Sequence, residues 1–304
     1  MRRKRLLRLS VLLAGITHTM AFAPAARTQA APPRIFSWIE TVQSEEGLAI
    51  RSPVAVTAIS ERELVVAEAT PEPRVLRLRR SGGAWALEGV VPLPAAPVDL
   101  VYDGKRLVVA LRQPAGLVSL EGSDRAVRRL PVSREIVPGR IAVASNGLLL
   151  VQDLAHDRIV ELDGSGKVAR QTDLPPGVTA LAAVSNGGFV IALAAESRVV
   201  RYDEQWREED SWSLAGDDSK PAWPVALDVA PDGEILVLDR HTGRILALDS
   251  NGRWIGFGSR QGWEPGLLWF PADLANVSEG LVVVADQGNG RVQLFRQVGK
   301  GGGE

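Results

Sequence analysis

The stretch PVALDVAPDGEILVLDRHTGRILALD, residues 224–249, decides the fold. It contains three short apolar runs, VALDV, EILVLD and RILALD, and the turns between them contain glycine. Apolar runs of this length, bounded by turn residues, predict short β-strands that pair as an antiparallel meander. The stretch therefore predicts a small all-β unit.

Units of the same design recur along the chain. PGRIAVASNGLLLVQDLAHDRIVELD begins at Pro138, and PADLANVSEGLVVVADQGNGRVQLF begins at Pro271. Aligning the units on their opening residue gives six of them, spaced 40 to 47 residues apart, which open at Pro53, Pro97, Pro138, Val178, Pro224 and Pro271. Repeats of this length predict the blades of a β-propeller, each with four strands.

The two ends of the repeat region predict how the ring closes. The last unit lacks a fourth strand, because the chain ends soon after Phe295. Residues 35–40 can supply that strand, with Trp38 at the position that Trp254 has in the fifth unit. We therefore expect an all-β, six-bladed β-propeller over residues 35–297, with four-stranded blades and a ring closed by an N-terminal strand in the last blade. Such closure protects strand edges from aggregation.

The repeats resemble the NHL repeat. An Asp-x4-Arg spacing occurs in the third, fifth and sixth units, at Asp153 and Arg158, Asp239 and Arg244, and Asp286 and Arg291. The resemblance covers about residues 35–297 and is weaker in the other three units. It implies a six-bladed ring that binds partners, and it implies no chemistry. From the residues themselves, we interpret each Asp/Arg pair as a structural clamp across a turn.

The first 30 residues have the features of a secretory signal peptide. Residues 2–8 are rich in arginine and lysine, residues 11–22 are mostly apolar, and several alanines follow. The apolar run is shorter than the about 20 residues that a membrane span needs. We expect export to a secreted or periplasmic location, and an uncleaved N-terminal anchor is the alternative. No later segment is apolar enough for a span, and the glycine-rich residues 298–304 are expected to be a disordered tail.

Composition excludes several classes of partner and cofactor. There is no cysteine, so the chain has no disulfide, no thiol nucleophile and no thiolate-bound metal. Lys and Arg number 35 against 36 Asp and Glu, which lacks the basic excess typical of nucleic-acid binding. We expect a monomer that binds no nucleic acid.

The mouth of the central channel is predicted from the position two residues after each opening residue. Asp99, Arg140 and Asp273 are the charged residues there, and alanines occupy the other three positions. Asp99 and Arg140 belong to adjacent units, where they can pair. Because an arginine sits in the ring of side chains and a metal needs converging carboxylates or imidazoles, we expect a polar channel without a metal. A calcium ion is the open alternative.

Signals of catalysis are sparse. His156 and His241 fall in turns two units apart, too far from each other to share a zinc ion. Glu45, Glu46 and Gly47 are only loosely similar to the calcium site of gluconolactonase-like propellers. We therefore predict no catalytic residues.

Three classes of function follow. We favour an exported, non-catalytic binding or scaffold module. The alternative is a metal-dependent lactonase or lyase of the gluconolactonase-like class, which would use Asp99, Asp228 and Asp273. A purely structural component of the envelope is the third class.

Tryptophans predict where a partner binds. Trp85, Trp212 and Trp254 recur in fourth strands and are expected to pack. Trp223 and Trp263 lie instead in connections on the upper face, our name for the face with the second-to-third and fourth-to-first connections. Exposed aromatic residues on one face favour a protein or glycan partner. The predicted binding residues are therefore Trp223, Arg260, Trp263 and Glu264, with burial of both tryptophans as the alternative.

Overall fold

The computed structural model describes residues 33–42, 50–121, 126–215 and 221–299. The chain divides into two units, Met1–Ala30 and Ala31–Glu304, and every described residue belongs to the second. The predicted signal peptide, Glu45, Glu46 and Gly47, and residues 300–304 of the predicted tail lie outside the described residues. Apart from two single-turn helices, η1 (Ala194–Glu196) and η2 (Gln287–Asn289), the described elements are β-strands.

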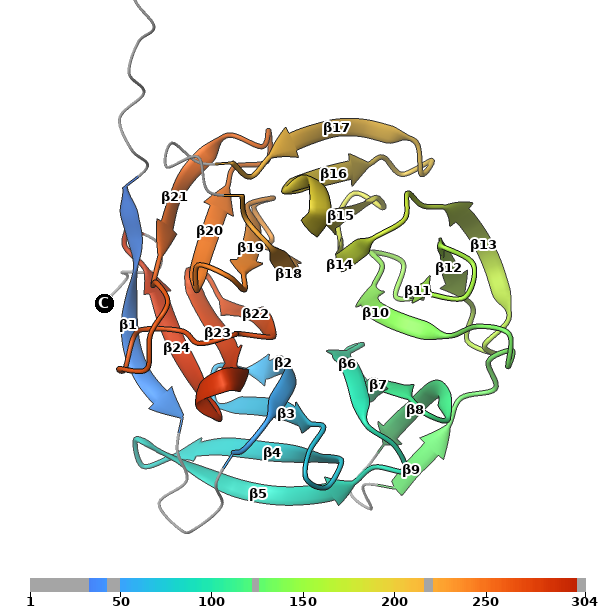
Figure 1. Ribbon diagram of the computed structural model, residues 1–304. Helices are drawn as coiled ribbons and strands as arrows, with labels where there is room; N and C mark the ends of the chain where they lie inside the picture. Colours follow the sequence, from blue (N-terminus) through green and yellow to red (C-terminus); the bar gives the residue numbers. More distant parts are fainter. Residues whose placement is uncertain (1–32, 43–49, 122–125, 216–220, 300–304) are drawn as a thin grey trace, which may run out of the picture. The chain divides into compact units, whose positions relative to one another are not determined.

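The strands of Ala31–Glu304 form sheets arranged in a ring, shown in Figure 1. Four of the sheets have four antiparallel strands each: β2 (Pro53–Ser60), β3 (Glu63–Glu68), β4 (Arg74–Ser81) and β5 (Ala84–Pro92); β6 (Pro97–Tyr102), β7 (Leu107–Arg112), β8 (Ala115–Glu121) and β9 (Ala126–Arg129); β10 (Pro138–Val143), β11 (Leu149–Asp153), β12 (Arg158–Leu162) and β13 (Val168–Asp173); β14 (Val178–Ala183), β15 (Phe189–Leu193), β16 (Arg198–Tyr202) and β17 (Glu208–Ser213).

The remaining sheet has eight strands, in the order β18 (Pro224–Val229), β19 (Ile235–Asp239), β20 (Arg244–Leu248), β21 (Trp254–Gly258), β1 (Arg34–Val42), β24 (Arg291–Gln297), β23 (Leu281–Asp286) and β22 (Asp273–Ser278). The strand β1 pairs antiparallel with β24 and also pairs in parallel with β21. The prediction of six four-stranded blades is therefore wrong. The structure has four four-stranded sheets and one eight-stranded sheet, in which β1 joins the fifth repeat unit to the last.

Two glycines of β21 explain this join. A Cβ atom on Gly258 would lie 2.2 Å from the Cβ of Phe36, and one on Gly256 would lie 2.4 Å from the carbonyl oxygen of Pro33. Side chains at these two positions would therefore block β1. Glycine allows the close approach, and the Pro33 carbonyl accepts a hydrogen bond from the amide of Phe257 at 3.0 Å.

The core lies between neighbouring sheets. The second strands are mostly apolar and buried along almost their whole length, as in ILVLD of β19, because both faces of such a strand are packed against neighbouring sheets. One core cluster shows how β1 contributes: Phe36 is buried together with Leu238 of β19, Val284 of β23 and Phe295 of β24. Burial of each such side chain stabilises the fold by about 1.5–3 kcal/mol.

Buried aspartates fix the connections on the upper face, which faces the viewer in Figure 1 with η1 and η2 in front. Asp239 accepts a hydrogen bond from the amide of Trp223 at 3.0 Å, just before β18 begins. Asp286 accepts one from the amide of Trp269 at 2.7 Å and pairs with Arg291 at 2.8 Å. Each carboxylate thus ties the turn after a second strand to the connection that enters the same unit. The backbone beside Trp223 and Trp269 is held in place.

Candidate functional site

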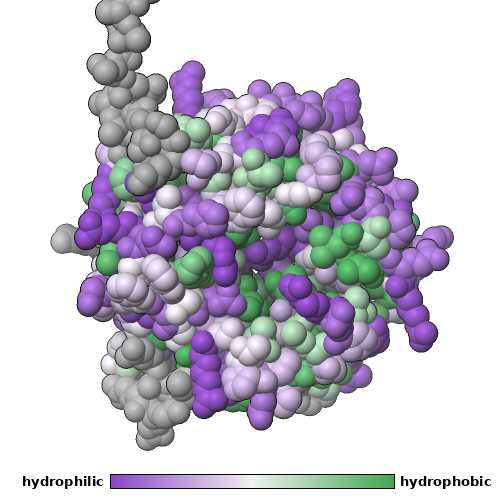
Figure 2. Space-filling model, viewed as in Figure 1, coloured by the Kyte–Doolittle hydropathy of each residue, from purple (hydrophilic) through white to green (hydrophobic). Residues whose placement is uncertain are grey.

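A cavity of about 280 Å³ lies on the axis of the ring. It is lined by β2, β6, β10, β14, β18 and β22, the first strands of the repeat units. Most of its lining residues have apolar side chains, but polar atoms make up the larger part of its surface; the charged residues are Asp99, Arg140, Asp228 and Asp273. Figure 2 shows hydrophilic residues gathered around the centre of the ring, with hydrophobic residues in separate patches among them.

The predicted residues of the channel mouth lie together. Nη1 of Arg140 is 3.6 Å from Oδ1 of Asp99 and 3.9 Å from Oδ1 of Asp273. The other guanidinium nitrogens donate hydrogen bonds to the main-chain oxygens of Thr179, Val225 and Ala272. Arg140 therefore reaches from β10 across the channel and is bonded to several other repeat units.

The buried aspartates of the channel join neighbouring units. Each accepts a hydrogen bond from an amide of the next first strand: Asp99 from Ile141 at 2.8 Å, Asp228 from Asn276 at 2.6 Å, and Asp273 from Val56 at 2.8 Å. Asp228 uses its second oxygen to accept a hydrogen bond from Val229 at 2.8 Å. These carboxylates are thus engaged by the backbone of the ring itself.

Burial governs the ionisation of these carboxyls. Burial raises the pKa of Asp99 above its ordinary value, although the positive charge of Arg140 acts in the opposite direction. It also raises the pKa of Asp228, although the amide hydrogen bonds to that carboxylate act in the opposite direction. Burial, together with the negative charge of Asp99, holds the pKa of Asp273 well above its usual range, and Arg140 acts against both effects. One guanidinium faces two carboxyls, so the second carboxyl keeps its proton to a higher pH than an exposed one.

A continuous row of aromatic and cationic side chains crosses the upper face. The rings of Trp263 and Trp269 are 5.2 Å apart, and those of Trp269 and Phe270 are 5.0 Å apart. The guanidinium carbon of Arg240 is 5.5 Å from the centre of Phe270. His241 follows Arg240 in the chain and stacks on Trp223 at 5.1 Å. We call Trp263, Trp269, Phe270, Arg240, His241 and Trp223 the aromatic row.

Much of this row is open to solvent. The exposed fraction is 69% for Trp263, 40% for Trp223 and 39% for Phe270. The row also comes near the channel, because Arg240 donates a hydrogen bond to the Pro271 carbonyl at 3.1 Å and the charge of Arg140 acts on it. Burial, with this neighbouring positive charge, lowers the pKa of Arg240.

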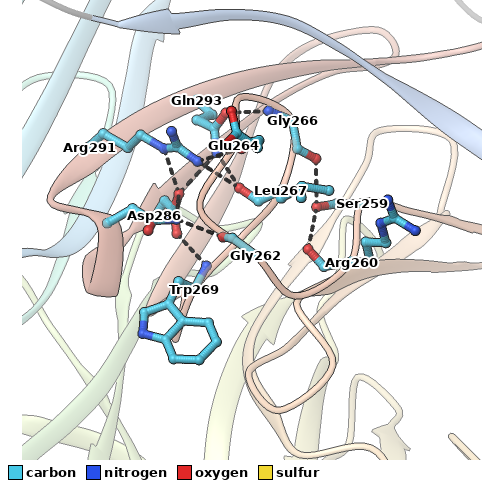
Figure 3. Close-up of polar contacts among 11 residues, drawn as sticks. Ser259, Arg260, Gly262, Glu264, Gly266, Leu267, Trp269, Asp286, Arg291 and Gln293 are labelled. Carbon is cyan, nitrogen blue, oxygen red and sulfur yellow. Dashed lines mark hydrogen bonds and ion pairs between the residues drawn. The ribbon is translucent and has the colours of Figure 1, made fainter.

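The connection that carries Trp263 is held by the hydrogen bonds drawn in Figure 3. Arg291 donates hydrogen bonds to the carbonyl oxygens of Glu264 at 2.8 Å and Leu267 at 2.9 Å. The side chain of Gln293 binds the same connection twice, at the Gly266 amide and at the Leu267 carbonyl. Trp263 is therefore exposed although its backbone is fixed.

Of the four predicted binding residues, two lie in the aromatic row and two lie outside it. Trp223 and Trp263 lie in the aromatic row. Arg260 is exposed, but its side chain points away from Trp269 (Figure 3). Glu264 is also exposed, and its main-chain oxygen is held by Arg291.

Sequence reasoning missed four members of the row: Trp269, Phe270, Arg240 and His241. Arg240 and His241 lie in the turn after a second strand, and Trp269 and Phe270 come directly before the proline that opens the last unit, where aromatic residues are expected to pack. Their position in the chain was the available signal, because turns after second strands lie on the same face as Trp223 and Trp263.

The fourth-strand tryptophans differ in burial: Trp85 is buried and Trp254 is partly buried, whereas Trp38 is 42% exposed.

Among the residues that the structure describes, no three His, Cys, Asp or Glu side chains come together as a metal site. Within the same residues, none of the helices has the length and apolar character needed to cross a membrane.

Comparison with known proteins identifies the fold. No protein-family model and no curated protein matches the sequence. Among solved structures, a streptogramin B lyase has a TM-score of 0.62 at 12% identity, over 86% of this chain and 98% of that one. Virginiamycin B lyase from Staphylococcus aureus has a TM-score of 0.59 at 10% identity, over 86% and 99%. A protein of unknown function from Bacteroides thetaiotaomicron has a TM-score of 0.65 at 14% identity, over 86% and 75%. At these identities the likeness concerns the fold alone, and the chain is an all-β propeller.

Proposed function

We propose that the chain is an exported, non-catalytic propeller that binds a macromolecular partner on its upper face through the aromatic row. The observation that carries this proposal is the exposure of Trp263, at 69%, on a connection that is hydrogen-bonded in place. An exposed tryptophan with a fixed backbone loses little conformational entropy on binding. Contiguous exposed aromatic residues are typical of binding surfaces. The proposed location, secreted or periplasmic, depends on the signal-like residues 1–30.

The state of the channel residues supports binding over catalysis. Raised pKa values in a cavity are often a sign of acid–base chemistry. Here, however, both oxygens of Asp228 accept main-chain hydrogen bonds, and Asp99 and Asp273 also hold neighbouring first strands. Groups that are already used to join the sheets are poorly suited to exchange partners with a substrate. The resemblance of the repeats to the NHL repeat, which implies partner binding, points in the same direction.

A lyase or lactonase is the second candidate, because two of the structural neighbours are named as lyases. In that case Asp99, Asp228 and Asp273 would face the substrate or a metal ion. Elemental analysis of the purified protein separates the two candidates. Stoichiometric calcium or zinc, removed by a chelator together with a lactonase or lyase activity, would favour the enzyme.

Chemical cross-linking in extracts of the source organism tests the binding function. We expect the wild-type chain to capture a defined partner, and the double variant Trp223→Ala/Trp263→Ala to lose it. Val90→Ala is the matched control, because Val90 is 40% exposed on β5 of another sheet. If the double variant retains the partner, the row is not the binding surface. If the wild-type chain captures nothing, a purely structural role is favoured.

A further inference from the structure

We propose that the aromatic row binds an extended, acidic and proline-rich segment of a polypeptide. This inference rests on the proposed function and adds the chemistry of the ligand. Three properties of the row carry it: an arginine without a carboxylate, indole donors without acceptors, and rings that are tilted against one another.

Arg240 supplies the charge. Nη1 donates to the carbonyl oxygen of Pro271 at 3.1 Å and Nη2 donates to Oε1 of Gln287 at 3.2 Å, so neutral acceptors fix the guanidinium. No carboxylate of the described chain pairs with it. A half-buried cation without a counter-charge is costly, and a carboxylate from a partner would relieve that cost. The ligand is therefore acidic where it meets Arg240.

The tryptophans supply hydrogen-bond donors. The indole N–H groups of Trp223, Trp263 and Trp269 have no acceptor among the residues that the structure describes. A polypeptide in the polyproline II conformation has no internal hydrogen bonds, so its carbonyl oxygens are free to accept from such donors. Proline-rich segments bind aromatic-lined grooves in this conformation, with a small loss of entropy.

The angles between the rings favour a peptide over a sugar. Trp263 and Trp269 are tilted by 36°, and Trp269 and Phe270 meet nearly edge to face, at 79°. Rings at these angles do not form a flat platform for a pyranose, whereas a pyrrolidine ring can pack against one of them at a time. Trp223 and His241 are nearly parallel, at 19°, so each of these two rings already covers one face of the other.

Three probes of about equal length test the inference by fluorescence anisotropy with the full chain. They are a labelled peptide of Pro-Pro-Glu repeats, the neutral peptide of Pro-Pro-Gln repeats, and an oligogalacturonate as an acidic glycan. We expect the acidic peptide to bind more tightly than the neutral one. Arg240→Gln should weaken only the acidic peptide, by about tenfold. Trp263→Ala should weaken both peptides by about tenfold or more, and Val90→Ala should weaken neither.

Several results would overturn the inference. One is no binding of the Pro-Pro-Glu peptide at millimolar concentration. Another is peptide binding that neither Arg240→Gln nor Trp263→Ala reduces, which would place the peptide elsewhere. Binding of the oligogalacturonate alone, lost in Trp263→Ala, would make the ligand a glycan and leave the proposed function standing. The proposed function itself is tested separately: it fails if the wild-type chain captures no partner, or if native partner capture survives the Trp223→Ala/Trp263→Ala change.

Discussion

Two arginines near the axis of the ring, Arg140 and Arg240, have opposite relations to the rest of the chain. Arg140 is surrounded by two carboxylates and three carbonyl oxygens from other repeat units. Arg240 meets two neutral acceptors and an aromatic ring, at the edge of an exposed row. The chain supplies the counter-charges of the first arginine and leaves the second without one. The difference separates a group that holds the sheets together from a group that is available to a partner.

The largest effect is expected from Arg140→Met. The change leaves buried Asp99 and Asp273 without their shared cation and leaves three carbonyl oxygens without a donor. Breaking a buried ionic cluster by removing one partner costs about 3–5 kcal/mol, so we expect a loss of that size in the free energy of unfolding. Chemical denaturation measures it. A loss below about 1 kcal/mol would show that the cluster does not hold the ring.

Tryptophans give the next comparison, between Trp254→Ala and Trp263→Ala. Trp254 packs partly buried against the cluster that contains Leu246 and Leu248, and its truncation should cost about 3 kcal/mol. Trp263 is largely exposed, and its truncation should change the free energy of unfolding by no more than about 0.5 kcal/mol. Thermal melting of the two variants side by side is the measurement. Equal losses would assign Trp263 to packing.

Asp273→Asn is expected to have a smaller effect, which is a change in how the free energy of unfolding depends on pH. In the unfolded chain, Asp99, Asp228 and Asp273 lose their protons at about pH 3.9. In the folded protein their pKa values are raised, so they keep these protons to a higher pH. The free energy of unfolding should therefore fall as the pH rises from about 4 through the raised values. Asparagine keeps an oxygen for the Val56 amide and removes the charge. We expect Asp273→Asn to flatten this fall and to gain about 1 kcal/mol at neutral pH.

Melting curves between pH 4 and pH 8 check this expectation. The control is Asp273→Ala, which removes the acceptor for Val56 as well as the charge and should destabilise the protein at every pH. A fall with pH that persists unchanged in Asp273→Asn would contradict the assignment of the effect to this carboxyl.

An effect on stability as small as that of Trp263→Ala is expected from Arg240→Gln. Burial and the positive charge of Arg140 both act against the charged guanidinium, so the neutral side chain should change the free energy of unfolding by only about 0.5 kcal/mol. The same denaturation experiment as for Arg140→Met gives the value. A loss as large as that of Arg140→Met would remove the distinction between the two arginines.

Much of the strand layout was predictable from sequence. The apolar runs expected as second strands coincide with β3, β7, β11, β15, β19 and β23 within two residues, because a strand buried on both faces is mostly apolar. The joining of two repeat units was not predictable from apolar periodicity. It depends on a lateral contact between the edges of β1 and β21, for which Gly256 and Gly258 are the only mark in the sequence.

The candidate site was predictable only in part. Trp223 and Trp263 stood out because long connections on a rigid ring are common places for binding residues. Arg240 did not stand out, because the sequence does not show which side chains surround it in the folded chain. The pairing of Asp99 with Arg140 followed from adjacent units. The main-chain oxygens that complete the surroundings of Arg140 come from residues up to 132 positions away, which no local pattern reveals.

The position of β1 also bears on how the chain folds. The strand nearest the start of the described chain pairs with the last one, so that Val42 is opposite Val292, 250 residues further along. Contacts between such distant residues slow folding, because the chain must close a long loop before they form. The eight-stranded sheet cannot be completed until β24 has been synthesised. The ring of sheets therefore closes only after nearly the whole described chain has been made.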